Sequence, residues 1–316
     1  MTSLLGAHVS IAKGVELAPG RGDDLGCEAI QIFSKNQRRW AAKPLTEEAA
    51  EAFREAFKKS QQQAVAIHDS YLINLADLRE ENVAKSREAF VVELDRAQLL
   101  GVPHLIFHPG NHRGDGMEAG IRQIAASLDF CFEHAAAPDV KVLLEGTAGA
   151  GNSVGSTFEQ LHGVREEVDD SARVGYCLDT CHLFAAGYNL RTEVNYELVM
   201  RHAENVIGLE NIRAFHLNDC KGELGSHLDR HEHIGQGGIG PEGFRLLVND
   251  ARWDGVPMYL ETPGREEHFE ENLKVLKGMR GSYPLGPEPP TRAAFSLARL
   301  IPAPSLPVVA PGLRPR

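Results

Sequence analysis

The chain has no run of about 18 uncharged apolar residues, the length that a helix needs to cross a bilayer, so no transmembrane helix is expected. Its N-terminus lacks a basic stretch followed by an apolar segment, so no signal peptide is expected. Basic charge is scarce, because 33 lysines and arginines against 44 aspartates and glutamates leave a net charge of −11. This balance excludes a surface coated with basic patches. It does not exclude a local face for nucleic acid, since bound divalent cations would reverse the charge there.

Cysteine is also sparse, and the five cysteines form an odd, scattered set: Cys27, Cys131, Cys177, Cys181 and Cys220. Such a set is typical of reduced thiols in a cytoplasmic protein rather than of a disulfide framework. Cys177 and Cys181 are close in sequence, but Asp179 and His182 are the better metal ligands there. We therefore interpret both thiols as packing residues.

The remaining sequence alternates between strand-like and helix-like segments over most of its 316 residues. Strands are predicted at 3–8, 28–33, 64–68, 103–108, 140–145, 173–179, 211–217 and 256–261. Helices are predicted at 46–60, with Thr46 as N-cap, and at 81–100, 116–136, 156–166, 193–206, 241–250 and 265–279. Eight such alternations favour a single α/β domain, a (β/α)8 TIM barrel, over residues 1–280.

Most of the predicted strands end on a residue type that binds metals. These strand-end residues are His8, His68, His108, Glu145, Asp179, His216 and Glu261. Imidazole and carboxylate groups suit zinc and related divalent metals. In a parallel barrel the carboxyl ends of the strands form the active face, so the pattern predicts a metal site at that face.

The densest group of candidate ligands lies in the stretch 216–233, which holds His216, Asp219, His227, Asp229, His231 and His233. Asp229 and His231 are two residues apart, so in extended chain they point to the same side. With His182, which lies three residues after Asp179, the plausible ligands number nine: His68, His108, Glu145, Asp179, His182, His216, Asp229, His231 and Glu261. One catalytic zinc needs three protein ligands, so nine indicate a cluster of two or three ions.

Two glycine-rich segments imitate nucleotide-binding motifs. Gly235, Gly237 and Gly240 match a dinucleotide fingerprint but do not follow a strand. Residues 146–155 follow a strand but lack the lysine of a P-loop. We interpret both as tight loops in which the backbone approaches a substrate or the metal ligands.

As a set, eight short motifs resemble those of the endonuclease IV family of apurinic/apyrimidinic endonucleases, over residues 4 to about 280. The motifs are GAHVS (6–10), KNQRRW (35–40), HDSYLINL (68–75), HPG (108–110), LEGTAGAGNSVG (144–155), CLDTCHLFAAGY (177–188), FHLNDCKGELGSHLDRHEHIGQGGIG (215–240) and LETP (260–263). The resemblance implies a TIM barrel with a trinuclear zinc site.

The resemblance also implies how the nine ligands divide. Glu145 would bridge two ions, the first completed by His68 and His108, and the second by Asp179, His216 and Glu261. A third ion would be held by His182, Asp229 and His231. The carboxylates Glu145, Asp179 and Glu261 are the expected catalytic residues, and Mn²⁺ or Fe²⁺ could replace zinc at some positions.

Two positions depart from the family pattern without affecting the ligands: Gly146 stands where the family has asparagine, and His227 where it has a neutral residue. The positions that the family inserts into DNA fall on Arg38 and Tyr71, with Leu72 beside the latter. The implied substrate is double-stranded DNA with abasic sites or 3′-blocked ends, cut 5′ to the lesion by a monomeric enzyme with no membrane association. The products would be a 3′-hydroxyl and a 5′-deoxyribose phosphate.

Two other functions stay open from the sequence. A metal-dependent sugar isomerase or epimerase can use the same barrel, although such sites usually need one or two ions and few histidines. A non-catalytic binder of damaged DNA could use the metals structurally.

Residues 281–316 differ in composition from the rest, with nine of the seventeen prolines and a net charge of +3. Such a segment is predicted to be a flexible tail that adds little to a packed core. Its arginines Arg292, Arg299, Arg314 and Arg316 could contact DNA or a partner.

Overall fold

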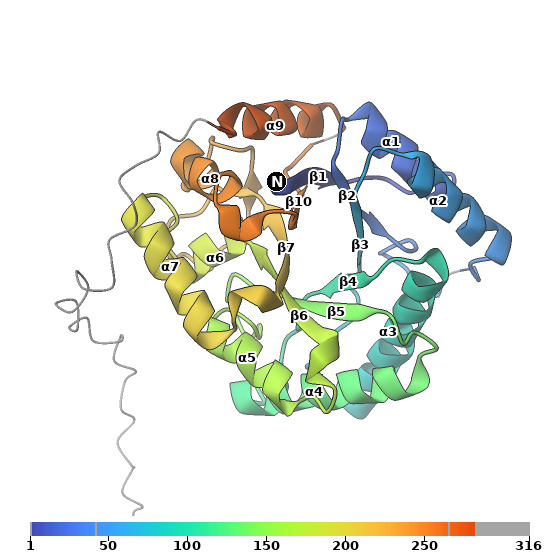
Figure 1. Cartoon of the computed structure of the whole chain (residues 1–316). Helices are drawn as coiled ribbons and strands as arrows, with labels where there is room; N and C mark the ends of the chain where they lie inside the picture. The colour runs from blue at the N-terminus through green and yellow to red at the C-terminus, as the bar shows by residue number, and fades with distance from the viewer. Residues whose placement is uncertain (1, 42, 265, 282–316) are drawn as a thin grey trace, which may run out of the picture. The chain divides into compact units, whose positions relative to one another are not determined.

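In the computed structural model, residues 2–41, 43–264 and 266–281 are described. Within them, eight parallel strands close into a barrel in the order β1–β2–β3–β4–β5–β6–β7–β10 and back to β1 (Figure 1). Their bounds are β1 Leu4–His8, β2 Ala29–Phe33, β3 Ala64–His68, β4 His104–Phe107, β5 Lys141–Glu145, β6 Val174–Asp179, β7 Ile212–Leu217 and β10 Pro257–Leu260. The predicted (β/α)8 barrel is confirmed, although β4 and β10 end one residue before His108 and Glu261.

The helices form a ring outside the strands (Figure 1). They are α1 Ala18–Asp24, α2 Glu47–Lys59, α3 Glu80–Leu100, α4 Met117–His134, α5 Phe158–Glu167, α6 Thr180–Ala186, α7 Glu193–Val206, α8 Gly240–Val248 and α9 Glu266–Met279. Short 3₁₀ turns lie at Val15–Leu17, Ser171–Arg173, Leu209–Asn211 and Ala251–Trp253. Thr46 caps α2 as predicted, since its hydroxyl accepts from the backbone N–H of Ala49 at 3.3 Å. No helix among these described residues is long and apolar enough to span a membrane.

A layer of buried side chains closes the interior of the barrel. It consists of one residue from each of seven strands: Ala29, Ala66, Ile106, Leu143, Cys177, Ala214 and Tyr259. In β1 the corresponding place belongs to Gly6, where a Cβ would lie 1.7 Å from the carbonyl oxygen of Ala29. The interior is therefore a packed core with no room for a channel.

The five cysteines are free, as predicted, and all are buried, including Cys177 and Cys181, which were interpreted as packing residues. The predicted tail, apart from Gly281, lies outside the described residues. The division into a barrel domain and a tail therefore stays a prediction.

Candidate metal centre

A layer of polar side chains lies directly above the closing layer of the barrel. In a strand, residues two apart point to the same face, and each interior residue is followed two positions later by a polar one. The eight polar residues are His8, Gln31, His68, His108, Glu145, Asp179, His216 and Glu261. The alternation of the strands thus brings together the seven predicted strand-end residues and one more, Gln31.

Glu145 lies at the centre of this layer and is fully buried. Its Oε2 is 3.1 Å from His68 Nε2 and 3.3 Å from His108 Nε2. Its Oε1 is 2.9 Å from His216 Nδ1 and 3.3 Å from His182 Nδ1. One carboxylate is therefore in reach of four imidazoles from four different segments of the chain.

A second set of potential ligand atoms lies around the same nitrogen of His216 that faces Glu145. Its Nδ1 lies 3.5 Å from Glu261 Oε2 and 3.9 Å from Asp179 Oδ2. Asp179 also caps α6, because its Oδ1 accepts from the backbone N–H of His182 at 2.8 Å. The cap fixes the end of β6 and the first turn of α6 together, so that Asp179 and His182 reach the site from one strand-to-helix junction.

The remaining two predicted ligands arrive on a small hairpin that the sequence did not predict. It pairs β8 Asp219–Cys220 with β9 His231–Glu232 in antiparallel fashion. Asp229 Oδ1 lies 3.3 Å from both His182 Nε2 and His231 Nε2. The three side chains form a separate group at the more exposed edge of the site.

The nine residues lie in three groups that have the membership implied by the family resemblance. Potential ligand atoms lie within 4.8 Å of one another in His68–His108–Glu145, in Glu145–Asp179–His216–Glu261 and in His182–Asp229–His231. The contacts quoted above between ring nitrogens and carboxylate oxygens span 2.9–3.9 Å. Two ligands about 2.0–2.1 Å from one tetrahedral zinc would be roughly 3.3–3.4 Å apart, so the donor set fits such ions. Cys181, Asp179 and His231 form one more group whose potential ligand atoms lie within 4.8 Å of one another.

The hydrogen bonds on the outer side of four rings favour the same interpretation. His68 Nδ1 donates to the Asp69 carbonyl at 3.0 Å, and His182 Nδ1 donates to the Gly146 carbonyl at 2.8 Å. His231 Nδ1 donates to the Glu261 carbonyl at 3.1 Å. His216 Nε2 donates to Gln31 Oε1 at 2.8 Å. In His68, His216 and His231 the donating nitrogen faces away from the carboxylates of the cluster, whereas His182 Nδ1 also lies 3.3 Å from Glu145 Oε1. The other nitrogen of each ring faces a carboxylate of the cluster, which is the arrangement that holds metal-binding histidines.

The pKa values show how strongly the groups depend on one another. Burial alone would raise the pKa of Glu145, but His108, His216 and His182 hold it well below the usual value. Burial would lower the pKa of His68, yet Glu145 raises it to about 10. His231 follows the same rule, with burial opposed by Asp179 and Asp229 and a pKa of about 9. The carboxylates and the imidazoles of the cluster thus each favour the charged form of the other.

Sequence reasoning missed Gln31, which is fully buried in the polar layer. Its Nε2 donates to Glu261 Oε1 at 2.6 Å and lies 2.9 Å from His8 Nδ1, while its Oε1 accepts from His216. Asn218 plays a similar part, because its Nδ2 donates to Asp179 Oδ2 at 2.6 Å. Neither amide is a usual zinc ligand, so neither was among the predicted ligands. The only signal for Gln31 was a polar residue inside the apolar run of β2.

Three members of the stretch 216–233 do not join the cluster. His227 Nδ1 donates to the Ala148 carbonyl at 2.9 Å, and His233 Nδ1 lies 3.0 Å from Asn272 Nδ2. Asp219 accepts from the backbone N–H groups of Gly237 and Ile239 at 3.0 and 2.9 Å. The glycine-rich segment 235–240 is a tight loop as predicted, but its backbone approaches Asp219 rather than a substrate or the metal ligands.

The residues predicted to contact DNA lie on two loops beside the cluster. Tyr71 is 62% exposed, and its ring centroid is 5.6 Å from that of His68. Arg38 is exposed, and Leu72 is half-buried. The Ser70 hydroxyl donates to the Gln37 carbonyl at 2.7 Å, which ties the loop of Tyr71 to the loop of Arg38.

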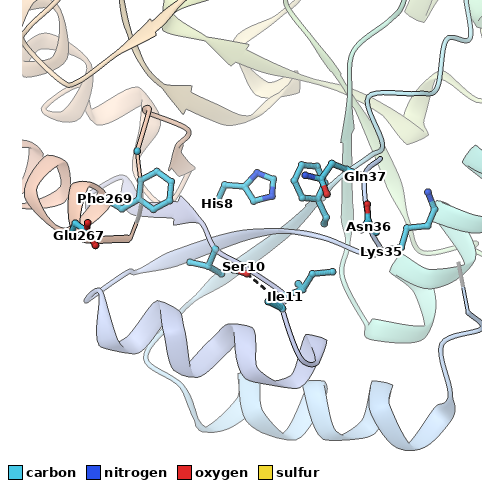
Figure 2. A pocket seen from close by; sticks show the side chains of 12 residues that line it. His8, Ser10, Ile11, Lys35, Asn36, Gln37, Glu267 and Phe269 are labelled. Carbon is cyan, nitrogen blue, oxygen red and sulfur yellow. Dashed lines mark hydrogen bonds between the residues drawn. The ribbon is translucent and has the colours of Figure 1, made fainter. Parts of the chain in front are cut away.

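Two cavities flank these loops. One of about 840 Å³ has His8 and Phe33 in its lining and is bounded by residues 9–12, 35–37, Gly264, Glu267 and Phe269 (Figure 2). The other, of about 280 Å³, is lined by Tyr71 together with His108, His182 and Asp229. The smaller cavity therefore reaches three of the candidate ligands directly, whereas the larger one reaches the polar layer only at His8.

Comparisons with known proteins agree with the motifs. The family described as xylose isomerase-like TIM barrel matches residues 21–279. A probable endonuclease 4 of Chloroflexus aurantiacus is 44% identical over 276 residues, which cover 87% of this chain and 97% of the relative. A probable endonuclease 4 of Methanoculleus marisnigri is 45% identical over 280 residues, covering 88% and 99%.

Solved structures give the same result. The crystal structure of endonuclease IV from Thermus thermophilus is similar with a TM-score of 0.79 and 34% identity, and the match covers 87% of this chain and 98% of that one. A D-tagatose 3-epimerase-like protein has a TM-score of 0.66 at 18% identity, a likeness of fold alone. The matches to these endonuclease IV relatives, at 34–45% identity, extend over nearly the whole length of each relative. The chain therefore belongs to the endonuclease IV family.

Proposed function

We propose that the protein is a DNA-repair endonuclease that hydrolyses the phosphodiester 5′ to an abasic site, leaving a 3′-hydroxyl and a 5′-deoxyribose phosphate. Removal of 3′-blocking groups would use the same chemistry. The observation that carries the proposal is the set of three ligand groups, two of which share Glu145. The names of the relatives, endonuclease 4 and endonuclease IV, support it.

In this proposal the nine ligands hold three zinc ions. Glu145 would be shared by two of them, with His68 and His108 on one side and Asp179, His216 and Glu261 on the other. His182, Asp229 and His231 would hold the third. When bound, the ions would activate a water molecule and neutralise charge on the phosphate. The same donors accept Mn²⁺ or Fe²⁺.

The protein's own contribution is to orient these donors. Gln31 directs the Nδ1 atom of His216 inward and restrains the Glu261 carboxylate, and Asn218 restrains Asp179. Because these supports are buried, the ligands would be in place before substrate arrives. Of the expected catalytic residues, Glu145 and Asp179 are fully buried and Glu261 lies next to the larger cavity through its contact with His8.

Double-stranded DNA is the proposed partner, and Arg38, Tyr71 and Leu72 would contact it at the damaged position. An abasic site lacks pairing and stacking, so extruding that nucleotide costs less than extruding an intact one. The tie between Ser70 and Gln37 would keep the two loops at a fixed separation during insertion. The monomeric state and the cytoplasmic location stay predictions.

A sugar isomerase or epimerase is the alternative suggested by the fold. The third ligand group, His182–Asp229–His231, argues against it, because one or two ions are enough for that chemistry. A non-catalytic binder of damaged DNA is the other alternative, and closed ligand shells would favour it.

The test combines metal analysis with cleavage of a duplex that carries one abasic site. Three ions per chain and incision 5′ to the lesion are expected, and a chelator should abolish incision until metal is returned. Incision without metal would overturn the metal assignment. Binding of abasic duplex without incision by the fully loaded protein would establish the non-catalytic alternative.

A further inference from the structure

A buried ion pair lies beneath the loop that carries Arg38 and takes no part in the ligand cluster. Lys35 Nζ is 2.7 Å from Glu93 Oε1, and each side chain is 2% exposed. Lys35 is the second residue after β2, whereas Glu93 lies within α3. Although Lys35 lines the larger cavity, Figure 2 shows its side chain directed away from His8.

Stability alone is a weak reason for this pair. Removing two charges from water is unfavourable, and replacing a buried ion pair with apolar residues of similar volume is often neutral or stabilising. Glu93 also accepts a hydrogen bond at its Oε2 from the Ser34 hydroxyl at 2.5 Å. The two contacts therefore fix the position of Ser34 and Lys35 more than they add to the free energy of unfolding.

Arg96, one turn further along α3, binds both ends of the same loop. Its Nε donates to the Ser34 hydroxyl at 3.0 Å, its NH2 group donates to the Ser34 carbonyl, and its NH1 group donates to the Lys43 carbonyl at 3.3 Å. Together with the contacts of Glu93 to Ser34 and Lys35, these bonds attach the loop to α3 at its start and near its end. Because α3 is a regular helix of 21 residues, it is a rigid support for the loop.

The part of the loop between these anchors is short and leads directly to the proposed DNA contacts. The Asn36 side chain accepts from the backbone N–H of Arg38 at 2.9 Å, and the Gln37 carbonyl accepts from Ser70 beside Tyr71. Lys35, Asn36 and Gln37 form one wall of the larger cavity. A displacement of Lys35 would therefore move that wall and Arg38 together.

We propose that the Lys35–Glu93 ion pair, assisted by Arg96, is a positioning device that sets the loop of Arg38 for engagement of abasic DNA. This inference rests on the proposed function. Glu93 touches neither the ligand groups nor the loop tip, so its effect would be on substrate binding and not on the reacting atoms.

The decisive variant is the double substitution Lys35→Met and Glu93→Leu, which removes both charges without leaving either one buried alone. We expect a melting temperature and metal content close to wild type, a KM for abasic duplex raised at least about fivefold, and kcat within about twofold. Glu93→Gln should raise KM as well, but with a lower melting temperature, because Lys35 loses its partner. Glu88→Gln, an exposed site on the same helix, is the matched control and should change neither.

A further comparison asks whether the effect passes through Arg38. In an Arg38→Ala background the double substitution should raise KM by less than about twofold, because the residue that it positions is already absent. A double variant with wild-type KM would show that the pair serves stability alone and would overturn the proposal. So would equal effects in both backgrounds. Absence of incision by the wild-type protein would instead count against the proposed function, so the two failures are distinguishable.

Discussion

At the scale of single residues, Glu145 has the most demanding environment in the site. Its carboxylate is fully buried, which disfavours its charge, yet His108, His216 and His182 keep its pKa low. A buried carboxylate is tolerated only when it is paired in this way. The negative charge of Glu145 and the pKa values of the surrounding histidines therefore depend on one another.

Replacing Glu145 with Gln should reduce incision at least about 10³-fold, because a neutral amide cannot serve two cations as a carboxylate does. Steady-state incision of abasic duplex and metal analysis measure the effect. Glu118→Gln, at a side chain that is 90% exposed, is the control and should behave as wild type. Activity of the Glu145 variant within tenfold of wild type would contradict its proposed role.

Tyr71→Ala and Arg38→Ala should separate binding from metal content. We expect each to weaken binding of abasic duplex roughly tenfold to a hundredfold, because inserted side chains offset unstacking that costs a few kcal/mol. The metal content should not change, since neither residue belongs to a ligand group. Fluorescence titration and metal analysis test this, and wild-type affinity in both variants would rule out insertion.

Six of the nine candidate ligands could be proposed from the sequence because each lies at the end of an apolar strand, whereas His182, Asp229 and His231 were proposed from their spacing and density. A histidine or carboxylate at the end of an apolar run is recognisable without coordinates. Gln31 was missed because an amide in a buried strand has no such signature, and its role depends on His216 and Glu261, which are distant in sequence. Partners of this kind are visible only in three dimensions.

At the scale of elements, the seven predicted helices are present, whereas α1 and α6 were not among them. Each has seven residues, too few to show a helical period, and α1 also contains Pro19, Gly20 and Gly22. The β8–β9 hairpin was missed for a related reason, because strands of two residues cannot show alternation.

The start of α3 yields a prediction about pH. Hydrogen bonding from Arg79 lowers the pKa of Asp77 to about 2, against opposing burial. Its Oδ1 accepts from the backbone N–H of Arg79 at 3.1 Å, and its Oδ2 accepts from Asn82 at 3.2 Å. Because the pKa is lower in the folded state, this stabilisation is fully present above the unfolded pKa of about 3.9 and is lost as pH falls towards 2.

Asp77→Asn should therefore be less stable than wild type at pH 6, and the difference should narrow between about pH 4 and pH 2. Urea unfolding at several pH values measures it. A constant difference over that range would mean that the charge of Asp77 does not stabilise the turn before α3.

At the scale of the whole molecule, the tail is predicted from composition alone and lies outside the described residues apart from Gly281. Truncation after Arg280 should leave the melting temperature and low-salt incision nearly unchanged, because a proline-rich segment buries little apolar area. It should flatten the dependence of log K on log salt by up to about 0.9 for each lost phosphate contact. Identical slopes would exclude a DNA-binding role, and a large fall in melting temperature would show that the boundary was misplaced.

The packed layer below the ligands has a consequence for exchange kinetics. Because side chains such as Leu143, Cys177 and Tyr259 fill the interior of the described barrel, bound ions would enter and leave through the face that would receive DNA. A duplex seated there would cover the same exit. Release of metal to a chelator should therefore be slower when abasic duplex is bound. The rate of metal release should then not exceed the rate at which the DNA dissociates.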